Sequence, residues 1–134
     1  LYYHKIGTPQ SADELVFGGE AQPYRYIFGG VSEDGRFLFI NGAVNTNGNA
    51  LYFKDLQKPN APIVPIVENT ENNHSVIYSE GENFFIQTDL DAPNQRIVAT
   101  TASQPRPRNW KVLVPEKPEV LEGASFAGGK MFLN

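Results

Sequence analysis

The 134-residue sequence contains no cysteine, and this absence removes several kinds of chemistry at once. Disulfides, thiolate catalysis and cysteine-ligated metals are excluded within these residues. Positive charge is also scarce, because 11 Lys and Arg stand against 15 Asp and Glu and give a net charge of −4. Nucleic acids and anionic membranes are therefore not expected as partners, since both need clustered basic side chains.

Long apolar runs are missing as well. No stretch approaches the roughly 20 apolar residues that a membrane-spanning helix needs. The first six residues hold two Tyr, a His and a Lys, so they cannot form the apolar region of a signal peptide. The compartment stays open between cytoplasm and periplasm, because many exported proteins also lack cysteine.

Helical periodicity is the third absence. Twelve Gly and ten Pro interrupt nearly every stretch, and only Ser11–Leu15 suggests a helical turn, which its position after Gly7 and Pro9 makes more typical of a loop. Strand-forming runs recur instead, separated by turn residues such as Asp34-Gly35 and Asn47-Gly48. The predicted strands are Leu1–Ile6, Leu15–Phe17, Phe37–Gly42, Leu51–Leu56, Ile63–Val67, Ser75–Tyr78, Phe84–Thr88, Arg96–Thr101, Lys111–Val114 and Lys130–Leu133.

Two series of short repeats share nearly one period. Leu1-Tyr2-Tyr3 returns as Leu51-Tyr52-Phe53, and Phe39-Ile40-Asn41 returns as Phe85-Ile86-Gln87 and as Phe132-Leu133-Asn134. A serine and a Gly-containing turn precede each member of the second series, at Ser32, Ser79 and Ser125. Units of about four strands that recur every ~40–50 residues are typical of β-propeller blades.

The predicted fold is therefore all-β: consecutive four-stranded antiparallel blades of a β-propeller, about two and a half to three of them. The continuous apolar runs at 37–40 and 84–86 predict strands buried on both faces. The more polar runs 51–55 and 96–101 are expected at blade edges. Under three blades cannot close a ring of ~4–8, so we expect a fragment of a longer chain, with open edges that promote oligomers. The expected division is 1–30, the end of one blade; 31–70 and 71–118, two blades; and 119–134, the start of another.

Residues that could carry chemistry are few, and each has a simpler interpretation. Gly123–Ala127 nearly matches the G-x-S-x-G nucleophile elbow, but Ala127 replaces the last Gly and a strand follows instead of a helix. Nothing in the sequence positions His4 or His74 as a base beside a nucleophile, so packing or hydrogen-bonding roles are favoured.

The acidic and aromatic pairs are interpreted in the same way. Asp89-Leu90-Asp91 begins like a calcium loop, but Ala92-Pro93 breaks that pattern and favours a turn. Glu80-Gly81-Glu82 is more typical of a solvated hairpin. Tyr24 and Tyr26 are the aromatics most expected at the surface. We predict no catalytic, substrate-binding, cofactor-binding or metal-binding residue, and no cofactor.

Several of these stretches resemble one family. Leu1–Thr8 followed by Gln10–Asp13, and Trp110–Glu116, are similar to the β-propeller of the prolyl oligopeptidase (prolyl endopeptidase) family, and the matches keep their order. Weaker matches are Ser32–Arg36, Leu51–Leu56, Asn94–Arg96 and Val120–Glu122.

The resemblance implies a serine peptidase that cleaves short peptides after proline. Its propeller would cover the active site of an α/β-hydrolase catalytic domain in the same chain and exclude folded proteins. The catalytic Ser, Asp and His would lie beyond Asn134, so the 134 residues alone are predicted to be inactive. Relatives carry an arginine in the loop that corresponds to Asn41–Asn49, and no Arg is present here, so no substrate contact is transferred. Two alternatives stay open: a propeller that only binds ligands, and a neighbouring peptidase type of other specificity.

Overall fold

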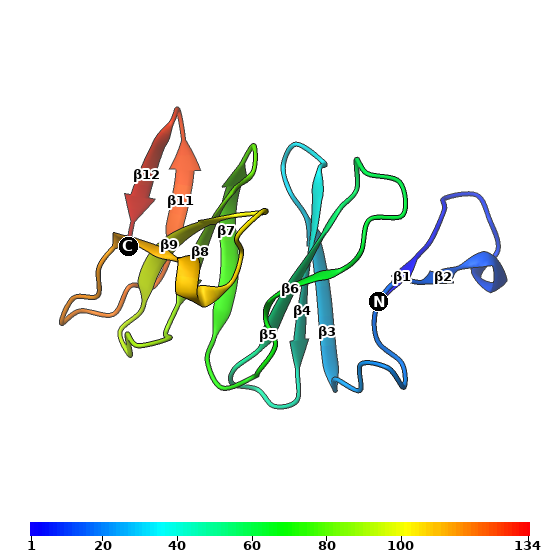
Figure 1. The fold of residues 1–134 in the computed structure, drawn as a ribbon, viewed down its shortest axis with the longest axis horizontal. Coiled ribbons are helices and arrows are strands. Elements are labelled where there is room, and N and C mark those ends of the chain that lie inside the picture. Colours follow the sequence, from blue (N-terminus) through cyan, green and yellow to red (C-terminus); the bar gives the residue numbers. More distant parts are fainter.

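A computed structural model describes all residues 1–134 as four antiparallel β-sheets that follow one another along the molecule (Figure 1). The chain crosses the view in Figure 1 from the two-stranded sheet near its N-terminus to the two-stranded sheet at its C-terminus. Two four-stranded sheets lie between them, each a meander in which consecutive strands pair. The all-β prediction with four-stranded antiparallel units is confirmed.

The four sheets contain twelve strands, and short turns join most neighbours. The first sheet holds β1 (Tyr2–Tyr3) and β2 (Glu14–Leu15), and the last holds β11 (Ala124–Ala127) and β12 (Lys130–Leu133). The second sheet contains β3 (Tyr26–Val31), β4 (Phe37–Ala43), β5 (Ala50–Asp55) and β6 (Val64–Val67). The third sheet contains β7 (His74–Glu80), β8 (Asn83–Thr88), β9 (Arg96–Thr101) and β10 (Lys111–Val114).

Helical structure is limited to two three-residue 3₁₀ turns, η1 (Gln10–Ala12) and η2 (Pro107–Asn109). η1 overlaps the stretch that was expected to be a loop, so a single turn does form there. Neither turn is long or apolar enough to cross a membrane.

Two strands were missed, and both are the first strands of their sheets. β3 contains Gly29-Gly30, a pair that suggests a turn because glycine weakens an isolated strand. All six residues of β3 pair with β4, and this pairing stabilises a strand that the glycine-containing sequence would not form alone. The predicted division at residue 30 falls inside β3, whose sheet starts at Tyr26. β11 is short and rich in alanine, and it forms only by pairing along its whole length with β12.

The repeat has the predicted period but a different register. The backbone N–H of Ser32 donates to the Phe37 carbonyl, and Ser79 pairs with Phe84 in the next sheet, so these positions correspond at an offset of 47. Phe39 therefore corresponds to Ile86, not to Phe85. The match between the triplets was therefore wrong by one residue. Such an error is hard to detect from sequence, because a strand with apolar side chains on both faces has no alternating pattern to fix its register.

The strands expected at sheet edges lie inside the sheets. β5 pairs with both β4 and β6, and β9 pairs with both β8 and β10. Both strands are largely buried. Leu51 and Phe53 of β5 and Ile97 and Val98 of β9 belong to the core, and only residues such as Lys54 are partly exposed. The true edges are β3 and β6 in one sheet and β7 and β10 in the other.

The core lies between the two four-stranded sheets and is largely aromatic. Phe84 of the third sheet is fully buried and packs edge-to-face against three phenylalanines of the second. The ring centroids of Phe37, Phe39 and Phe53 lie 4.9, 4.9 and 5.0 Å from that of Phe84. Edge-to-face contact at this distance adds to the gain from burying the rings. The runs 37–40 and 84–86 were expected to be buried on both faces. One face is buried in each strand, whereas Leu38 and Phe85 on the other face are only partly buried.

Arg36 joins the same two sheets at the hairpin end. Its Nη2 lies 3.2 Å from Asp55 Oδ2 within the second sheet and 2.9 Å from Glu82 Oε1 of the third. Its guanidinium also covers the Phe37 ring at 4.6 Å. Burial opposes ionisation of Asp55, but the hydrogen bonds from Arg36 and the Gln57 amide lower its pKa below the ordinary value. Arg36, the last residue of the Ser32–Arg36 turn, therefore connects the second and third sheets.

Candidate functional site

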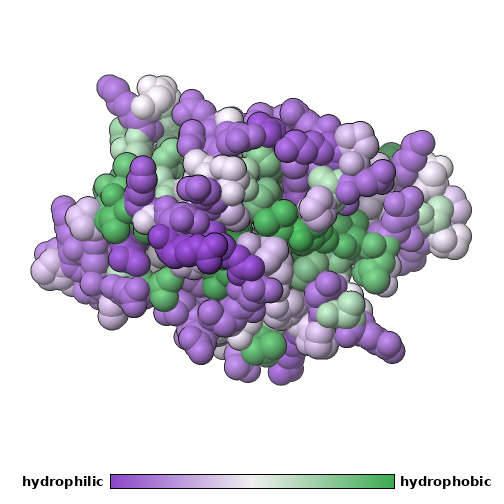
Figure 2. Space-filling model, in the orientation of Figure 1, coloured by the Kyte–Doolittle hydropathy of each residue, from purple (hydrophilic) through white to green (hydrophobic).

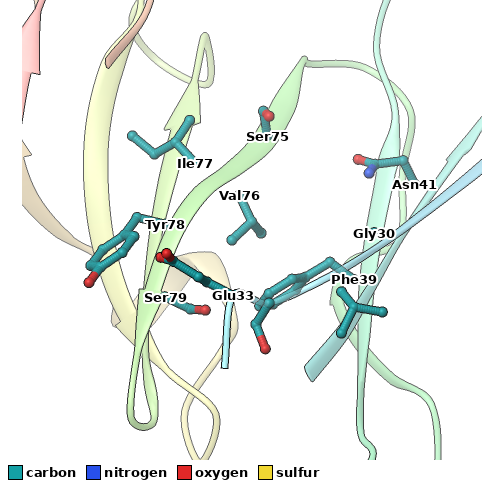
Figure 3. A pocket seen from close by; sticks show the side chains of 11 residues that line it. Gly30, Glu33, Phe39, Asn41, Ser75, Val76, Ile77, Tyr78 and Ser79 are labelled. Atoms are coloured by element: carbon teal, nitrogen blue, oxygen red, sulfur yellow. The ribbon is translucent and has the colours of Figure 1, made fainter. Parts of the chain in front are cut away.

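The first strands of the two central sheets frame a recess, which we call the β3–β7 recess. β3 and β7 are the edge strands of their sheets, and β4 supplies two further side chains from behind β3. The cavity measures about 280 Å³ (Figure 3). Its lining residues are Gly30, Val31, Ser32, Glu33, Phe39, Asn41 and Ser75–Ser79.

Polar groups are distributed along the recess. Figure 3 shows Glu33 beside Tyr78 and Ser79 at one end and Asn41 and Ser75 toward the other. Glu33 is exposed and forms no ion pair. The recess thus offers hydroxyl and amide hydrogen-bonding groups and one negative charge. It contains no His, Cys or Lys that could act as a base or nucleophile, so its chemistry is that of binding.

A second recess, of about 540 Å³, opens where the β4–β5 and β6–β7 loops meet. Side-chain amides hold these loops together. Asn49 Nδ2 donates to Asn41 Oδ1 at 2.8 Å and to the His74 carbonyl at 3.0 Å, while Asn49 Oδ1 accepts from the His74 N–H at 2.9 Å. Asn73 Nδ2 donates to Asn47 Oδ1 at 2.8 Å, and Asn73 Oδ1 accepts from the Gly48 N–H at 2.9 Å. The segment Asn41–Asn49, which contains no arginine, is therefore held between two sheets by a network of side-chain amides.

Figure 2 shows apolar side chains gathered across the middle of the face it displays and polar side chains on either side. Exposed apolar residues occur on strands of all four sheets. They include Tyr2, Tyr3, Phe28, Val31, Val112 and Phe132.

Ser125 lies in the middle of strand β11, where it pairs with Phe132. A nucleophile elbow places its serine on a sharp turn between a strand and a helix. The segment that follows β11 is a tight Gly128-Gly129 turn into β12. Ser125 therefore has the setting of an ordinary strand residue, and neither histidine is bonded to it.

His4 and His74 lie in different settings, and neither side chain is hydrogen-bonded to a serine. His4 Nδ1 lies 2.6 Å from Asp13 Oδ1 at the exposed end of the first sheet. His74 is buried, its Nδ1 lies 2.8 Å from Thr88 Oγ1, and its ring packs edge-on against Trp110 at 5.8 Å. Its Nε2 is buried without a hydrogen-bond partner. A packing and hydrogen-bonding role describes both residues.

The burial of His74 predicts a pH-dependent stability. Desolvation lowers its pKa from 6.5 to about 4, and the nearby Asp89 only partly opposes this. Because the unfolded chain binds the proton more readily, stability is full above pH 6.5 and falls as pH drops from 6.5 to 4. A shift of this size corresponds to roughly 3 kcal/mol. Urea unfolding at several pH values should show the fall, and His74→Gln should flatten it. An unchanged slope in that variant would assign the effect to other groups.

The acidic pairs form turns. Asp89 accepts hydrogen bonds from the Asn73 N–H at 2.7 Å and from Asn73 Nδ2 at 2.6 Å, so both of its oxygens are engaged. Asp91 lies in the left-handed region with φ 53° and pairs with Arg96 at 3.8 Å. Glu80 and Glu82 flank the β7–β8 turn, and Glu82 binds Arg36. No three His, Asp or Glu side chains come together as a metal site would require.

Tyr24 and Tyr26 differ from each other. Tyr24 is partly buried, and its hydroxyl lies 2.7 Å from that of Tyr52, beside Phe17. Tyr26 is 37% exposed and carries Arg25 over its ring at 5.4 Å. The expectation of an exposed pair therefore holds for Tyr26 only. The sequence analysis did not predict that Arg36 connects two sheets or that Gly30 lines a recess. The only signal for Arg36 was its place at the end of an Asp-Gly-Arg turn before an apolar strand.

Comparison with known proteins gives the same picture. Residues 1–134 match the family described as prolyl oligopeptidase, N-terminal beta-propeller domain. The chain belongs to this family. It is 43% identical over 132 residues to the prolyl endopeptidase of Elizabethkingia miricola and 42% identical to that of Elizabethkingia meningoseptica. Each match covers 98% of this chain and 18% of the relative, so the chain spans about a fifth of the length of these prolyl endopeptidases.

Solved structures of prolyl oligopeptidase family members share the fold. One from a study of two prolyl endopeptidases superimposes with a TM-score of 0.86 at 27% identity, over 98% of this chain and 19% of that chain. Prolyl oligopeptidase B from Galerina marginata, bound to a 35-residue substrate, gives a TM-score of 0.81 at 24% identity, over 94% and 18%. The antiparallel sheets are therefore a propeller segment of the prolyl oligopeptidase type.

Proposed function

We propose that this chain is a noncatalytic part of the β-propeller of a prolyl oligopeptidase-like serine peptidase. The observation that carries the proposal is the 43% identity to a prolyl endopeptidase over 98% of the chain. In this proposal each four-stranded sheet is one blade, and the two-stranded sheets belong to two further blades. An α/β-hydrolase catalytic domain elsewhere in the same protein would supply the serine, aspartate and histidine.

The proposed role of the segment is to cover the active site and limit access to short, proline-containing peptides. The geometry supports a rigid cover. Phe84, the Arg36–Glu82 ion pair and the asparagine network fix the two central sheets to each other at the core and at both ends. The recess between their first strands, about 280 Å³, is the size of a few residues and not of a folded domain.

The test uses the full-length protein that contains these residues. An octapeptide with a central Gly-Pro should be cleaved after proline, whereas the same octapeptide within a loop of a folded domain should resist. Glu82→Gln removes the ion pair between the two sheets, leaves Arg36 bound to Asp55, and should raise cleavage of the embedded sequence about two- to fivefold, the range expected for one partly exposed ion pair. The measurement is kcat/KM for both substrates.

The control is Arg108→Met, which removes an exposed arginine that forms no ion pair. It should leave both rates unchanged. Equal cleavage of free and embedded sequences by the wild type would refute the access role. Absence of any proline-dependent cleavage would refute the peptidase and favour a propeller that only binds.

A further inference from the structure

We propose that the β3–β7 recess is a binding site for an extended, positively charged peptide segment, which adds as a strand to the free edge of β3. The inference rests on the proposed function, in that peptides are the molecules this propeller would admit. It adds a defined site with named contacts inside the propeller itself. Four observations support it: an unpaired backbone edge, an open glycine, a charge without a partner and hydroxyls opposite.

The edge of β3 has unpaired backbone groups. β3 pairs only with β4, and the Ser32 N–H donates to the Phe37 carbonyl at 2.8 Å. In an antiparallel pair the backbone groups of alternate residues point toward and away from the partner strand. Ser32 and Gly30 thus face β4, while the N–H and C=O groups of Gly29 and Val31 face away from it. Such an edge is a template for an added strand.

Gly30 keeps the recess open beside this edge. A Cβ built at Gly30 meets no atom within 4 Å, and its φ is not positive, so neither the backbone nor the packing requires glycine there. Gly29 differs, because a Cβ there would lie 2.9 Å from Leu1 Cδ2 and meet packed side chains. Open space without a structural need is consistent with room for a ligand's backbone.

The charge around the recess favours a cationic ligand. Glu33 stands at its end and Glu80 lies in the adjoining depression, and neither forms an ion pair. Lys130 is the one basic residue that lines that depression, and the recess itself holds none. A lysine, an arginine or an N-terminal amine of a peptide would give Glu33 its partner.

The side facing β3 is suited to a peptide. Ser75 and Ser79 place hydroxyl groups along β7, and these groups can donate to or accept from peptide amides. Val76 and Phe39 supply an apolar floor between them. Alternating polar and apolar groups along an extended path match the two-residue period of a bound strand.

The experiment measures fluorescence anisotropy of a labelled, proline-free peptide, (Lys-Val-Thr)₃, with the full-length protein. Without proline the probe is not a substrate of the proposed peptidase, so binding and cleavage are tested separately. Two further probes are (Glu-Val-Thr)₃ and a version of the Lys peptide with alternate backbone nitrogens methylated. We expect the Lys peptide to bind and both other probes to bind at least about tenfold more weakly, because charge and strand pairing are each removed.

Two variants place the site. Gly30→Leu, whose Cβ would meet no atom within 4 Å, places a bulky side chain at the recess and should abolish binding. Glu33→Gln should weaken binding about fivefold, and Glu119→Gln, an exposed control outside the recess, should not. Equal binding of the acidic or methylated probe, or full binding by Gly30→Leu, would overturn the proposal. If Gly30→Leu fails to fold, Glu33→Gln and the methylated probe still decide. If the wild-type protein binds the Lys peptide as expected but shows no proline-specific cleavage, the proposed peptidase is refuted and this binding site is still supported.

Discussion

Replacing Phe84 with alanine is expected to lower the free energy of unfolding by about 3–5 kcal/mol, the range for a fully buried phenylalanine. Phe84 has no exposed surface and contacts the rings of Phe37, Phe39 and Phe53 edge-to-face. These three rings belong to the second sheet, whereas Phe84 belongs to the third. The substitution would therefore leave a cavity at the centre of the contact between sheets, where neither backbone can close it.

The matched control for this prediction is Phe28→Ala. Phe28 lies on β3 of the same pair of sheets but is 65% exposed, so its loss should change the free energy of unfolding by less than about 1 kcal/mol. Urea unfolding followed by the fluorescence of Trp110 measures both variants. Similar losses for the two would mean that the sheets are not held together by their aromatic core.

The all-β architecture could be predicted because the repeats and the turn residues that define it are local features of the sequence. Asp34-Gly35 predicts a tight turn by its backbone preferences alone, and Gly35 does have φ 74°. The apolar runs around Phe39 and Ile86 indicated strands buried on both faces, and both lie second in their sheets. Strand pairing between neighbours in sequence needs no long-range information, so a meander is readable from such signals.

The missed features depend on residues far apart in the sequence. Gly29-Gly30 forms a strand only because β4 pairs with it, and no local propensity predicts that. Arg36 finds Glu82 only when two hairpins from different sheets come together, 46 positions apart. The β3–β7 recess likewise exists between sheets. Sequence patterns thus defined the units, while the candidate site arises from the contacts between units.

The amide network between the same sheets leads to the second large effect. Gly48→Ala is expected to cost at least about 3 kcal/mol of unfolding free energy, because backbone strain and a clash act together. Gly48 has φ 79°, and a Cβ there would lie 2.0 Å from the Thr70 carbonyl oxygen, an atom of the backbone that cannot rotate away. The β4–β5 loop would have to move, which breaks the 2.9 Å hydrogen bond from the Gly48 N–H to Asn73 Oδ1.

Gly35→Ala separates the two causes of that effect. Gly35 has nearly the same φ, 74°, but a Cβ there meets nothing within 4 Å. Its substitution should therefore cost only the strain of the left-handed conformation, about 1–2 kcal/mol. The difference between the two variants in urea unfolding isolates the contact of the β4–β5 loop with the Thr70 backbone. Because that contact lies in the β4–β5 loop beside the second recess, equal losses would show that the loop yields easily and could rearrange around a ligand. A larger loss for Gly48→Ala would show that this face of the propeller is fixed by its own amide network.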